Sequence, residues 1–182
     1  MKRNLGPQTY VYPMPVLILG TYDQDGNPDA MNAAWGGTYD TNMVTVSLSK
    51  HQTTENLEAS GCFTMAFGTK STLKACDYVG IVSAKNEKDK IAKSGLTPSK
   101  APHINAPVFE EFPLTLECQV VSFEEGTLIG RILNVIVDDK VLTDGKIDPA
   151  KMEAIVYEPA THHYLLAAEV VGQAFKDGLA LK

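Results

Sequence analysis

The sequence LTLECQVVSFEEGTLIGRILNVIV, at positions 114–137, decides the fold class of this chain. The runs Leu114–Phe123 and Thr127–Val137 are both rich in β-branched and aromatic residues, which favour strands. Between them, Glu124-Glu125-Gly126 has the composition of a short turn. The stretch therefore predicts a long antiparallel hairpin.

Shorter strands are predicted on the N-terminal side of this hairpin. Pro15–Tyr22 is typical of a buried strand, and Asp25-Gly26 signals a turn into another extended segment. Asn42–Ser49 alternates apolar and polar residues, the pattern of a half-buried strand. Cys62–Phe67 is a further strand. The N-terminal half is thus expected to start with a hairpin and to contribute most of its strands to one sheet.

Helices are expected to be few and short. Thr53–Ser60 has threonines that can cap a helix and a glycine directly after it, and Ser71–Asp77 and Asn86–Ser94 have similar start and stop residues. Three prolines make Thr97–Pro107 an irregular excursion over the surface, of the kind that often forms a lid.

The order of these segments predicts a mainly β fold. Asp144-Gly145 marks one more turn, and no alternation of strands with long helices occurs. We therefore expect an antiparallel β-barrel with peripheral helices. The 182 residues, 44% of them hydrophobic, suit a single domain over 1–182.

Composition also excludes several classes of partner. The chain has 16 basic and 22 acidic residues, and its net charge of -6 argues against nucleic-acid binding. Its longest apolar stretches are far shorter than the roughly 20 residues needed to cross a bilayer, so no membrane partner is expected. The N-terminus fits a signal peptide poorly, which favours a cytoplasmic location.

Several catalytic motifs are absent. The glycines form neither a dinucleotide-binding nor a phosphate-binding loop, and no nucleophile elbow occurs. The histidines His51, His103, His162 and His163 have no metal-binding spacing, and on a strand the adjacent pair would point to opposite faces. No metal site is expected.

Cys62, Cys76 and Cys118 form no paired motif, so buried structural thiols are expected and none should be essential. The alternative is a redox-sensitive Cys76 whose thiolate is favoured by nearby Lys74.

The segment Ser47–Asn56 gathers hydroxyls and a lysine where a strand passes into a helix. Backbone N–H groups at a helix N-terminus favour a phosphate, Ser49, Thr53 and Thr54 can donate, and Lys50 adds a positive charge. The segment therefore predicts an anion cradle, with an ordinary helix cap and a solvated lysine as the alternative.

The segment Asn32–Gly37 combines an amide, the only tryptophan of the chain, and small residues. Small residues let a flat ligand approach the backbone, so a planar ring is expected here. Trp35 as a core or interface residue is the alternative.

Taken together, the order of these segments resembles the flavin-reductase-like, FMN-binding split-barrel family, and most closely its flavoredoxin-like members. The N-terminal likeness is carried by Pro15–Tyr22, Asn32–Trp35 and Val46–Leu48. The middle and distal likeness is carried by Asp77-Tyr78, Gly80, Ser83, Gly95–Thr97, Leu116–Cys118, Ile129-Gly130, Asp144–Lys146, Tyr164, Gly172, Ala174-Phe175 and Gly178. The family has glycine where Ala84 follows Ser83, and a glycine-containing pattern at Leu166–Ala168.

The resemblance implies an antiparallel split β-barrel that binds FMN. It implies ring contacts from Asn32, Ala33, Ala34 and Trp35, with His163 and Tyr164 nearby. It implies ribityl and phosphate contacts from Ser47, Leu48, Ser49, Lys50, Thr53, Thr54 and Asn56.

The resemblance also implies an oxidoreductase, with NADH or NADPH as the donor that reduces bound flavin. The alternatives are a flavoredoxin-like electron carrier with a redox protein partner, and a non-redox barrel that binds a small ligand. A homodimer is implied too, with Val11–Leu19 as a possible part of the interface.

Overall fold

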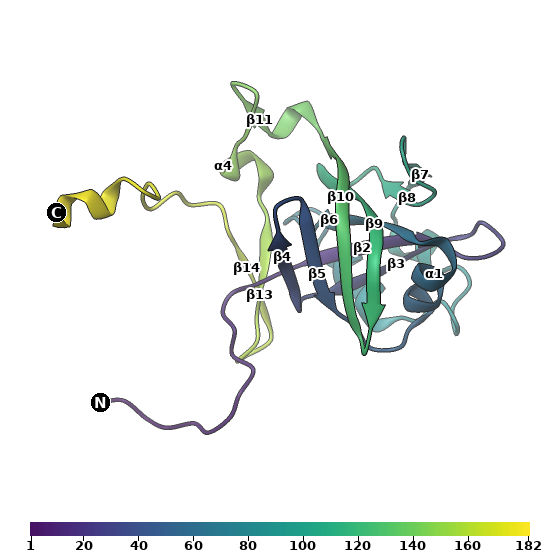
Figure 1. The fold of residues 1–182 in the computed structure, drawn as a ribbon, viewed down its shortest axis with the longest axis horizontal. Helices are drawn as coiled ribbons and strands as arrows, with labels where there is room; N and C mark the ends of the chain where they lie inside the picture. The colour runs from purple at the N-terminus through teal and green to yellow at the C-terminus, as the bar shows by residue number, and fades with distance from the viewer.

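The computed structural model describes residues 1–182 and contains one large antiparallel sheet. Its seven strands are β2 (Leu17–Tyr22), β3 (Pro28–Ala33), β4 (Gly36–Asp40), β5 (Met43–Ser47), β6 (Cys62–Phe67), β9 (Leu114–Glu124) and β10 (Thr127–Val137). They are ordered β3-β2-β6-β9-β10-β5-β4, and the sheet curls around an apolar interior as a split barrel (Figure 1). The predicted fold class is confirmed.

The long hairpin predicted at positions 114–137 is confirmed as β9 and β10. Their turn places Glu125 at φ 50° and Gly126 at φ 80°, and two positive φ values at the turn centre match the right-handed twist of the strands. The register shifts twice along the pair, between Ile129 and Gly130 and between Ile132 and Asn134. Such irregularities bend a long hairpin, which helps the sheet to curl.

The N-terminal hairpin of β2 and β3 is also confirmed. In its turn the Asp23 carboxylate accepts hydrogen bonds from the backbone N–H groups of Asp25 and Asn27, and Gly26 takes φ 81°. A second short hairpin pairs β11 (Leu142–Thr143) with β12 (Lys146–Ile147) around the predicted Asp144-Gly145 turn.

Four α-helices lie around the sheet: α1 (Gln52–Ser60), α2 (Leu73–Ile81), α3 (Lys90–Ser94) and α4 (Pro149–Met152). Two short 3-10 helices, η1 (Asp139–Val141) and η2 (Asp177–Leu181), complete the set. Helices α1 and α3 end at the predicted glycines, each in the left-handed region. Helix α2 extends beyond the predicted range, and α3 starts later than predicted. None of the helices has the length and apolar composition that a bilayer crossing requires.

Two smaller sheets correct details of the sequence prediction. Strand β1 (Met14–Pro15) pairs with β13 (Ile155–Glu158), which pairs with β14 (His163–Leu166). His162 lies in the β13–β14 turn at φ 61°, so the two adjacent histidines do not share a strand as assumed. Strand β7 (Pro98–Lys100), which lies in the stretch that was expected to be irregular, pairs with β8 (Pro107–Phe109), which begins at the end of that stretch.

The connection between β7 and β8 is held to the barrel by a buried carboxylate. Glu117 of β9 is fully buried and accepts hydrogen bonds from the His103 backbone N–H (2.8 Å), the His103 ring Nδ1 (2.8 Å) and Asn134 Nδ2 (2.6 Å). Burial by itself raises the pKa of Glu117, but these hydrogen bonds outweigh it and leave the pKa below its usual value. The connection is therefore anchored and is not the free lid that its prolines suggested.

The core has two parts. Leu17, Leu19, Val46 and Phe63 belong to the cluster inside the barrel, and a second cluster packs α2 and α3 against the sheet. Gly20 lies where three segments meet, because a Cβ added there would touch Thr64 Oγ1 and lie 2.9 Å from the backbone oxygen of Pro107. The apolar stretch at positions 11–19 is thus mostly core, and only residues 11–13 of it are exposed.

All three cysteines are buried and unpaired. Burial raises the pKa of Cys76 to about 11 and that of Cys118 to about 12. A thiolate is disfavoured in these places, so the redox-sensitive alternative for Cys76 is wrong.

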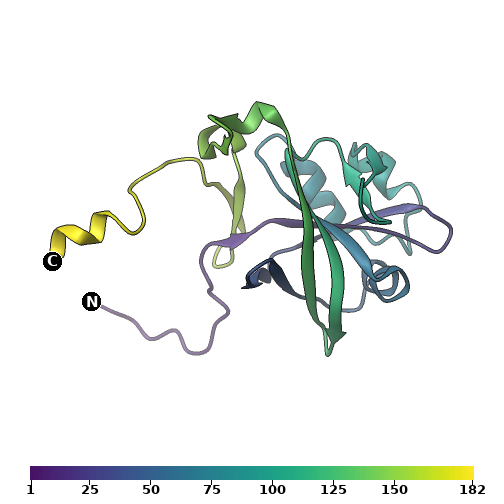
Figure 2. The same ribbon diagram turned by 45° about the horizontal axis from the view of Figure 1, so that its top comes forward.

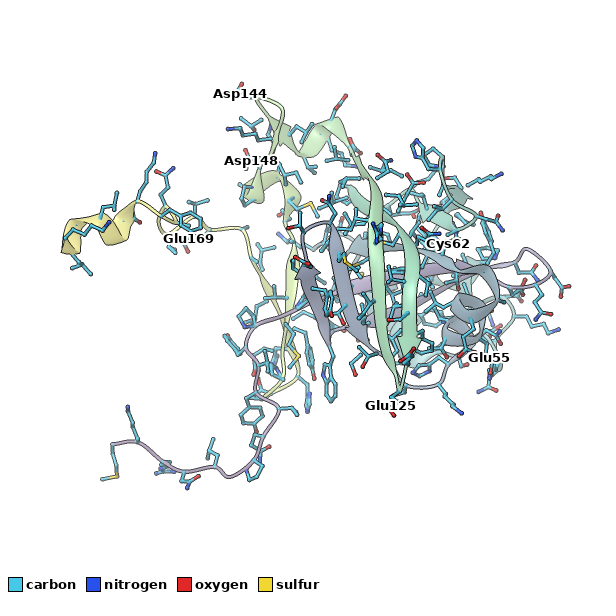
Figure 3. All side chains as sticks on the ribbon, in the orientation of Figure 1. Glu55, Cys62, Glu125, Asp144, Asp148 and Glu169 are labelled. Atoms are coloured by element: carbon cyan, nitrogen blue, oxygen red, sulfur yellow. The ribbon has the colours of Figure 1, made fainter.

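Both ends of the chain extend away from the barrel (Figures 1 and 2). Residues 1–13 and 169–182 are exposed throughout, and Glu169 lies well outside the barrel (Figure 3). The exposed residues include Val11 and Tyr12 at one end and Val171 and Phe175 at the other. We call residues 1–13 the N-terminal arm and residues 169–182 the C-terminal arm.

Candidate functional site

Three adjoining hollows meet at Asn32, near the end of β3. The first, of about 130 Å³, lies between the start of α1 and the segment after α2. The second, of about 310 Å³, lies between the ends of β3 and β5. The third, of about 360 Å³, lies beside α2 and β14. All three hollows have Asn32 as a lining residue, and we call them together the Asn32 groove.

The second hollow brings together two segments that the sequence analysis singled out. The end of β3 turns into β4 through Ala34 and Trp35, and the Ser47 N–H donates to the Trp35 backbone oxygen at 2.7 Å. This bond holds the two segments side by side. The hollow is lined by Met31, Asn32, Ala33, Ala34, Trp35, Ser47, Leu48, Ser49 and His51, so seven of the predicted contact residues share one wall.

Trp35 is 57% exposed although it is large and apolar. Its place in the wall of an open hollow excludes the core alternative. A flat exposed aromatic beside the small residues Ala33 and Ala34 offers a surface on which a planar ring can rest.

The side chains of Thr53, Thr54 and Asn56 are buried and already have partners. Thr53 Oγ1 donates to Asp29 Oδ2 at 2.8 Å, and Asn56 Nδ2 donates to Thr21 Oγ1 at 3.0 Å. Thr54 Oγ1 accepts from the His51 backbone N–H at 2.9 Å and donates to the His51 backbone oxygen at 2.8 Å. These side chains fix the start of α1.

Lys50 lines none of the three hollows of the Asn32 groove. Together with Leu48, Ser49 and Thr54 it lines a separate hollow that also contains Glu55, Glu58 and Glu125. Glu125 lies at the lower end of the long hairpin, and Glu55 lies on α1 to its right (Figure 3). Lys50 therefore shares this hollow with three carboxylates, a setting the local sequence did not indicate.

The first turn of α1 supplies the free donors of the groove. The backbone N–H groups of Gln52 and Thr53 have no acceptor within the protein, as expected for the first residues of a helix. Both residues line the first hollow, with Ser83 opposite. An anionic group placed there would meet unpaired N–H groups and the positive end of the helix dipole.

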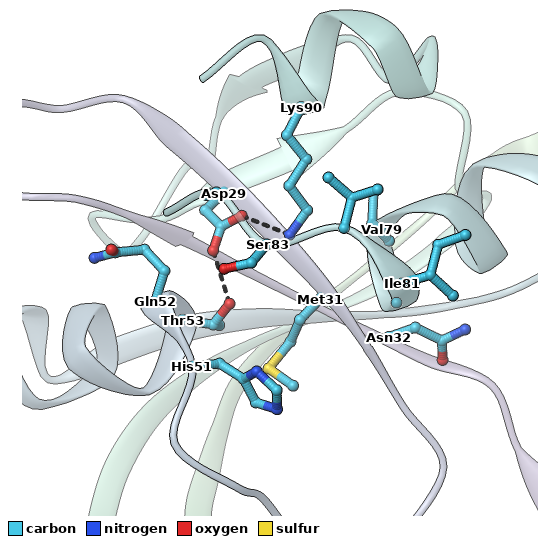
Figure 4. Close-up of a pocket in the computed structure, with 13 residues that line it drawn as sticks. Asp29, Met31, Asn32, His51, Gln52, Thr53, Val79, Ile81, Ser83 and Lys90 are labelled. Carbon is cyan, nitrogen blue, oxygen red and sulfur yellow. Dashed lines mark hydrogen bonds and ion pairs between the residues drawn. The ribbon is translucent and has the colours of Figure 1, made fainter. Parts of the chain in front are cut away.

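A buried ion pair at the floor of the first hollow was not predicted. Lys90 Nζ lies 3.0 Å from Asp29 Oδ1 and donates to the Ala30 backbone oxygen at 2.6 Å, while Thr53 donates to the other oxygen of Asp29 (Figure 4). Lys90 and Asp29 are 61 residues apart, so no local pattern links them. The pair ties α3 and α1 to β3.

Tyr164 lines the third hollow with Asn32 and Asp77, and its hydroxyl donates to Asp77 Oδ1 at 2.9 Å. Burial, and then the hydrogen bond to Asp77, raise the pKa of Tyr164 to about 12. His163 is exposed, lines none of the three hollows, and has its ring Nδ1 2.6 Å from Thr161 Oγ1. The structure thus brings Tyr164 but not His163 to the groove.

The composition of the groove limits its chemistry. It contains no cysteine, and no group of three or more histidine, cysteine or acidic side chains is placed to hold a metal ion. Its walls offer a flat aromatic, small side chains and one end rich in N–H donors. This arrangement suits an elongated ligand with a planar part and an anionic end.

Comparisons with known proteins agree with this description. The family model for the flavin reductase like domain matches residues 9–178. The flavoredoxin of Desulfovibrio vulgaris (Miyazaki F) is 36% identical, with a TM-score of 0.93 over 98% of this chain and 100% of that one. The flavoredoxin of Methanosarcina acetivorans is 26% identical, with a TM-score of 0.90 over the whole of both chains.

Other solved structures share the fold at lower sequence identity. Nitrilotriacetate monooxygenase component B from Bacillus cereus is 20% identical, with a TM-score of 0.80 over 95% of this chain and 99% of that one. No curated protein sequence matches the chain.

Proposed function

Because this chain belongs to the family of flavin reductase like domains, we propose that its Asn32 groove holds FMN and that the protein is an oxidoreductase passing electrons through it. One observation carries the proposal. The segments Asn32–Trp35 and Ser47–Ser49, which the sequence connects with a flavin, line a single hollow next to a helix N-terminus.

The residues present fit FMN. The planar ring would rest against Trp35 and the backbone of Asn32–Ala34, and the ribityl chain would pass the hydroxyls of Ser47 and Ser49. The phosphate would accept from the N–H groups of Gln52 and Thr53. The side chains of Thr53, Thr54 and Asn56 support this end indirectly, by holding the start of α1 in place.

Bound FMN supplies the hydride and electron chemistry, and the protein supplies position and electrostatics. Asn32, whose Nδ2 donates to the Cys76 backbone oxygen at 3.0 Å, is fixed at the centre of the groove. With its pKa raised to about 12, the Tyr164 hydroxyl stays protonated at alkaline as well as neutral pH, so it remains a hydrogen-bond donor.

NADH or NADPH is the proposed electron donor. A second candidate function is that of an electron carrier which takes electrons from another protein, and the full-length likeness to two flavoredoxins favours it. Anaerobic stopped-flow mixing of the FMN-loaded protein with each nucleotide separates the two. Bleaching of the flavin band within seconds supports the first candidate, and no bleaching by either nucleotide supports the carrier.

We also propose that the protein is a homodimer. Both arms expose apolar side chains, among them Val11, Val171 and Phe175, which a second copy would cover. A mass near twice 19.7 kDa by light scattering is the expected result.

Titration with FMN and with riboflavin tests the binding proposal, because the two share the ring and differ in the phosphate. Gln52→Pro removes one proposed phosphate donor, and proline is tolerated at the first position of a helix. The preceding residue, His51, has φ -138° and ψ 173°, which a following proline allows. A lost charge-assisted bond of about 1.5–3 kcal/mol should weaken FMN about ten- to a hundredfold.

The matched control is Gln52→Ala, which removes the same side chain but keeps the N–H group. It should bind FMN like the parent, and riboflavin should bind all three proteins equally. Equal losses for FMN and riboflavin in Gln52→Pro would place the phosphate elsewhere. A parent that stays colourless after incubation with FMN would instead indicate a barrel for a non-redox ligand.

A further inference from the structure

The charged side chains that line the Asn32 groove do not balance. Asp29 and Lys90 form an ion pair at 3.0 Å in the first hollow, so their charges offset each other. Asp77 lines the third hollow and takes part in no ion pair, and no basic residue lines that hollow. One negative charge therefore faces the part of the groove around Asn32 and Tyr164.

The position of this carboxylate is fixed across the fold. Asp77 lies on α2 and accepts from the Tyr164 hydroxyl of β14 at 2.9 Å, a contact between residues 87 positions apart. The Tyr164 hydroxyl is neutral, so it orients the Asp77 carboxylate without removing its charge. Asp77 is exposed, and the third hollow shares Asn32 and Ala34 with the second, so a ring resting against Asn32 and Ala34 would displace part of the water that screens the Asp77 carboxylate.

We propose that Asp77 lowers the reduction potential of the flavin held in the Asn32 groove, making the reduced protein a stronger electron donor. This inference rests on the proposed function. Reduction of a flavin by two electrons with uptake of one proton leaves a negative charge on the ring. A fixed carboxylate nearby disfavours that charge, and the repulsion is strengthened where water is excluded. Oxidised flavin, which has a neutral ring, is affected less.

The test is the midpoint potential of bound FMN, measured by equilibration with a reference dye. Asp77→Asn keeps the shape and an oxygen acceptor for Tyr164 but removes the charge. The equilibrium constant for reduction of the bound flavin should be about tenfold larger than in the parent. For a two-electron couple this is a rise of about 30 mV in the midpoint potential. Tyr164→Phe keeps the charge, so its potential should not rise. Asp25→Asn, in the exposed β2–β3 turn, controls for the change in net charge and should leave the potential unchanged.

A second variant changes the charge in the same hollow and leaves Asp77 unaltered. Ile81 is 75% exposed and lines this hollow, so Ile81→Lys would place a positive charge there, while Ile81→Gln is its neutral control. The lysine variant should also raise the potential, and the glutamine variant should not.

An unchanged potential in both Asp77→Asn and Ile81→Lys overturns the inference. So does an equal rise in Tyr164→Phe, because the hydrogen bond and not the charge would then be responsible. The parent is first titrated with FMN. A parent that binds no FMN would refute the proposed function, which is a different outcome from an unchanged potential.

Discussion

Replacing Lys90 by methionine isolates the buried ion pair beneath the groove. Asp29 and Lys90 have side chains that are each 4% exposed, and they are joined at 3.0 Å. Without the ammonium group, the Asp29 carboxylate would remain buried with only the Thr53 hydroxyl as a side-chain donor. Methionine fills nearly the same volume, so the variant changes charge much more than packing.

The expected cost is large because one charge is left without its partner. Breaking a buried pair in this way destabilises a protein by about 3–5 kcal/mol. With a urea slope of about 2 kcal/mol/M, the unfolding midpoint should fall by about 1.5–2.5 M. Far-UV circular dichroism during urea titration measures this shift.

Two further variants make the result specific. Lys93→Met removes a partner of Glu87 from a pair whose side chains are 54% and 28% exposed, and should leave the urea midpoint nearly unchanged, because solvent screens an exposed pair. The double variant Asp29→Asn with Lys90→Met leaves no buried charge, and should be more stable than Lys90→Met alone. If Lys90→Met costs no more than Lys93→Met, or if the double variant recovers nothing, the reasoning is refuted.

Other predictions follow from the core and the arms. The pKa of Glu117 is lowered in the folded protein, so the ionised carboxylate stabilises the fold above the unfolded pKa of about 4.3, and this stabilisation is lost as pH falls through the folded pKa. In Glu117→Gln, the free energy of unfolding should therefore fall less steeply with decreasing pH in the acid range. Gly20→Ala, which forces a Cβ toward the Pro107 oxygen, should cost about 1–3 kcal/mol in urea unfolding. Cys76 should stay unlabelled by a thiol reagent at pH 8 in the native protein, and rapid labelling would contradict its burial. Removing residues 169–182 should shift the proposed dimer toward the mass of one truncated chain in light scattering, and a mass that stays at two truncated chains would exclude the C-terminal arm from the interface.

Much of the fold was predictable because its signals are local. Hairpins at Glu125-Gly126 and Asp144-Gly145 depend on residues that accept positive φ, and helix ends at Gly61 and Gly95 depend on the same property. Alternation along β5 depends only on the period of a strand. These preferences act within a few residues, so the sequence displays them before any tertiary contact is known.

The candidate site was predictable in part for the same reason. Asn32–Trp35 and Ser47–Ser49 carry a local combination of small, aromatic and hydroxyl residues, and the structure places both in one hollow. Thr53 and Thr54 show what the local sequence pattern does not decide. A threonine at a helix start can donate to a ligand or to its own protein, and only the packing around α1 shows that both hydroxyls are engaged internally.

The remaining features of the site depend on strand order and packing. Asp29 meets Lys90 across 61 positions, and Asp77 meets Tyr164 across 87, with no spacing rule to connect either pair. The sequence by itself determined the long hairpin, the N-terminal hairpin, β5, β6 and two segments of the groove, because those follow from backbone preference and local pattern. The tertiary structure alone decided which charges are paired in the groove, because burial and long-range contact arise only when the barrel closes on its helices.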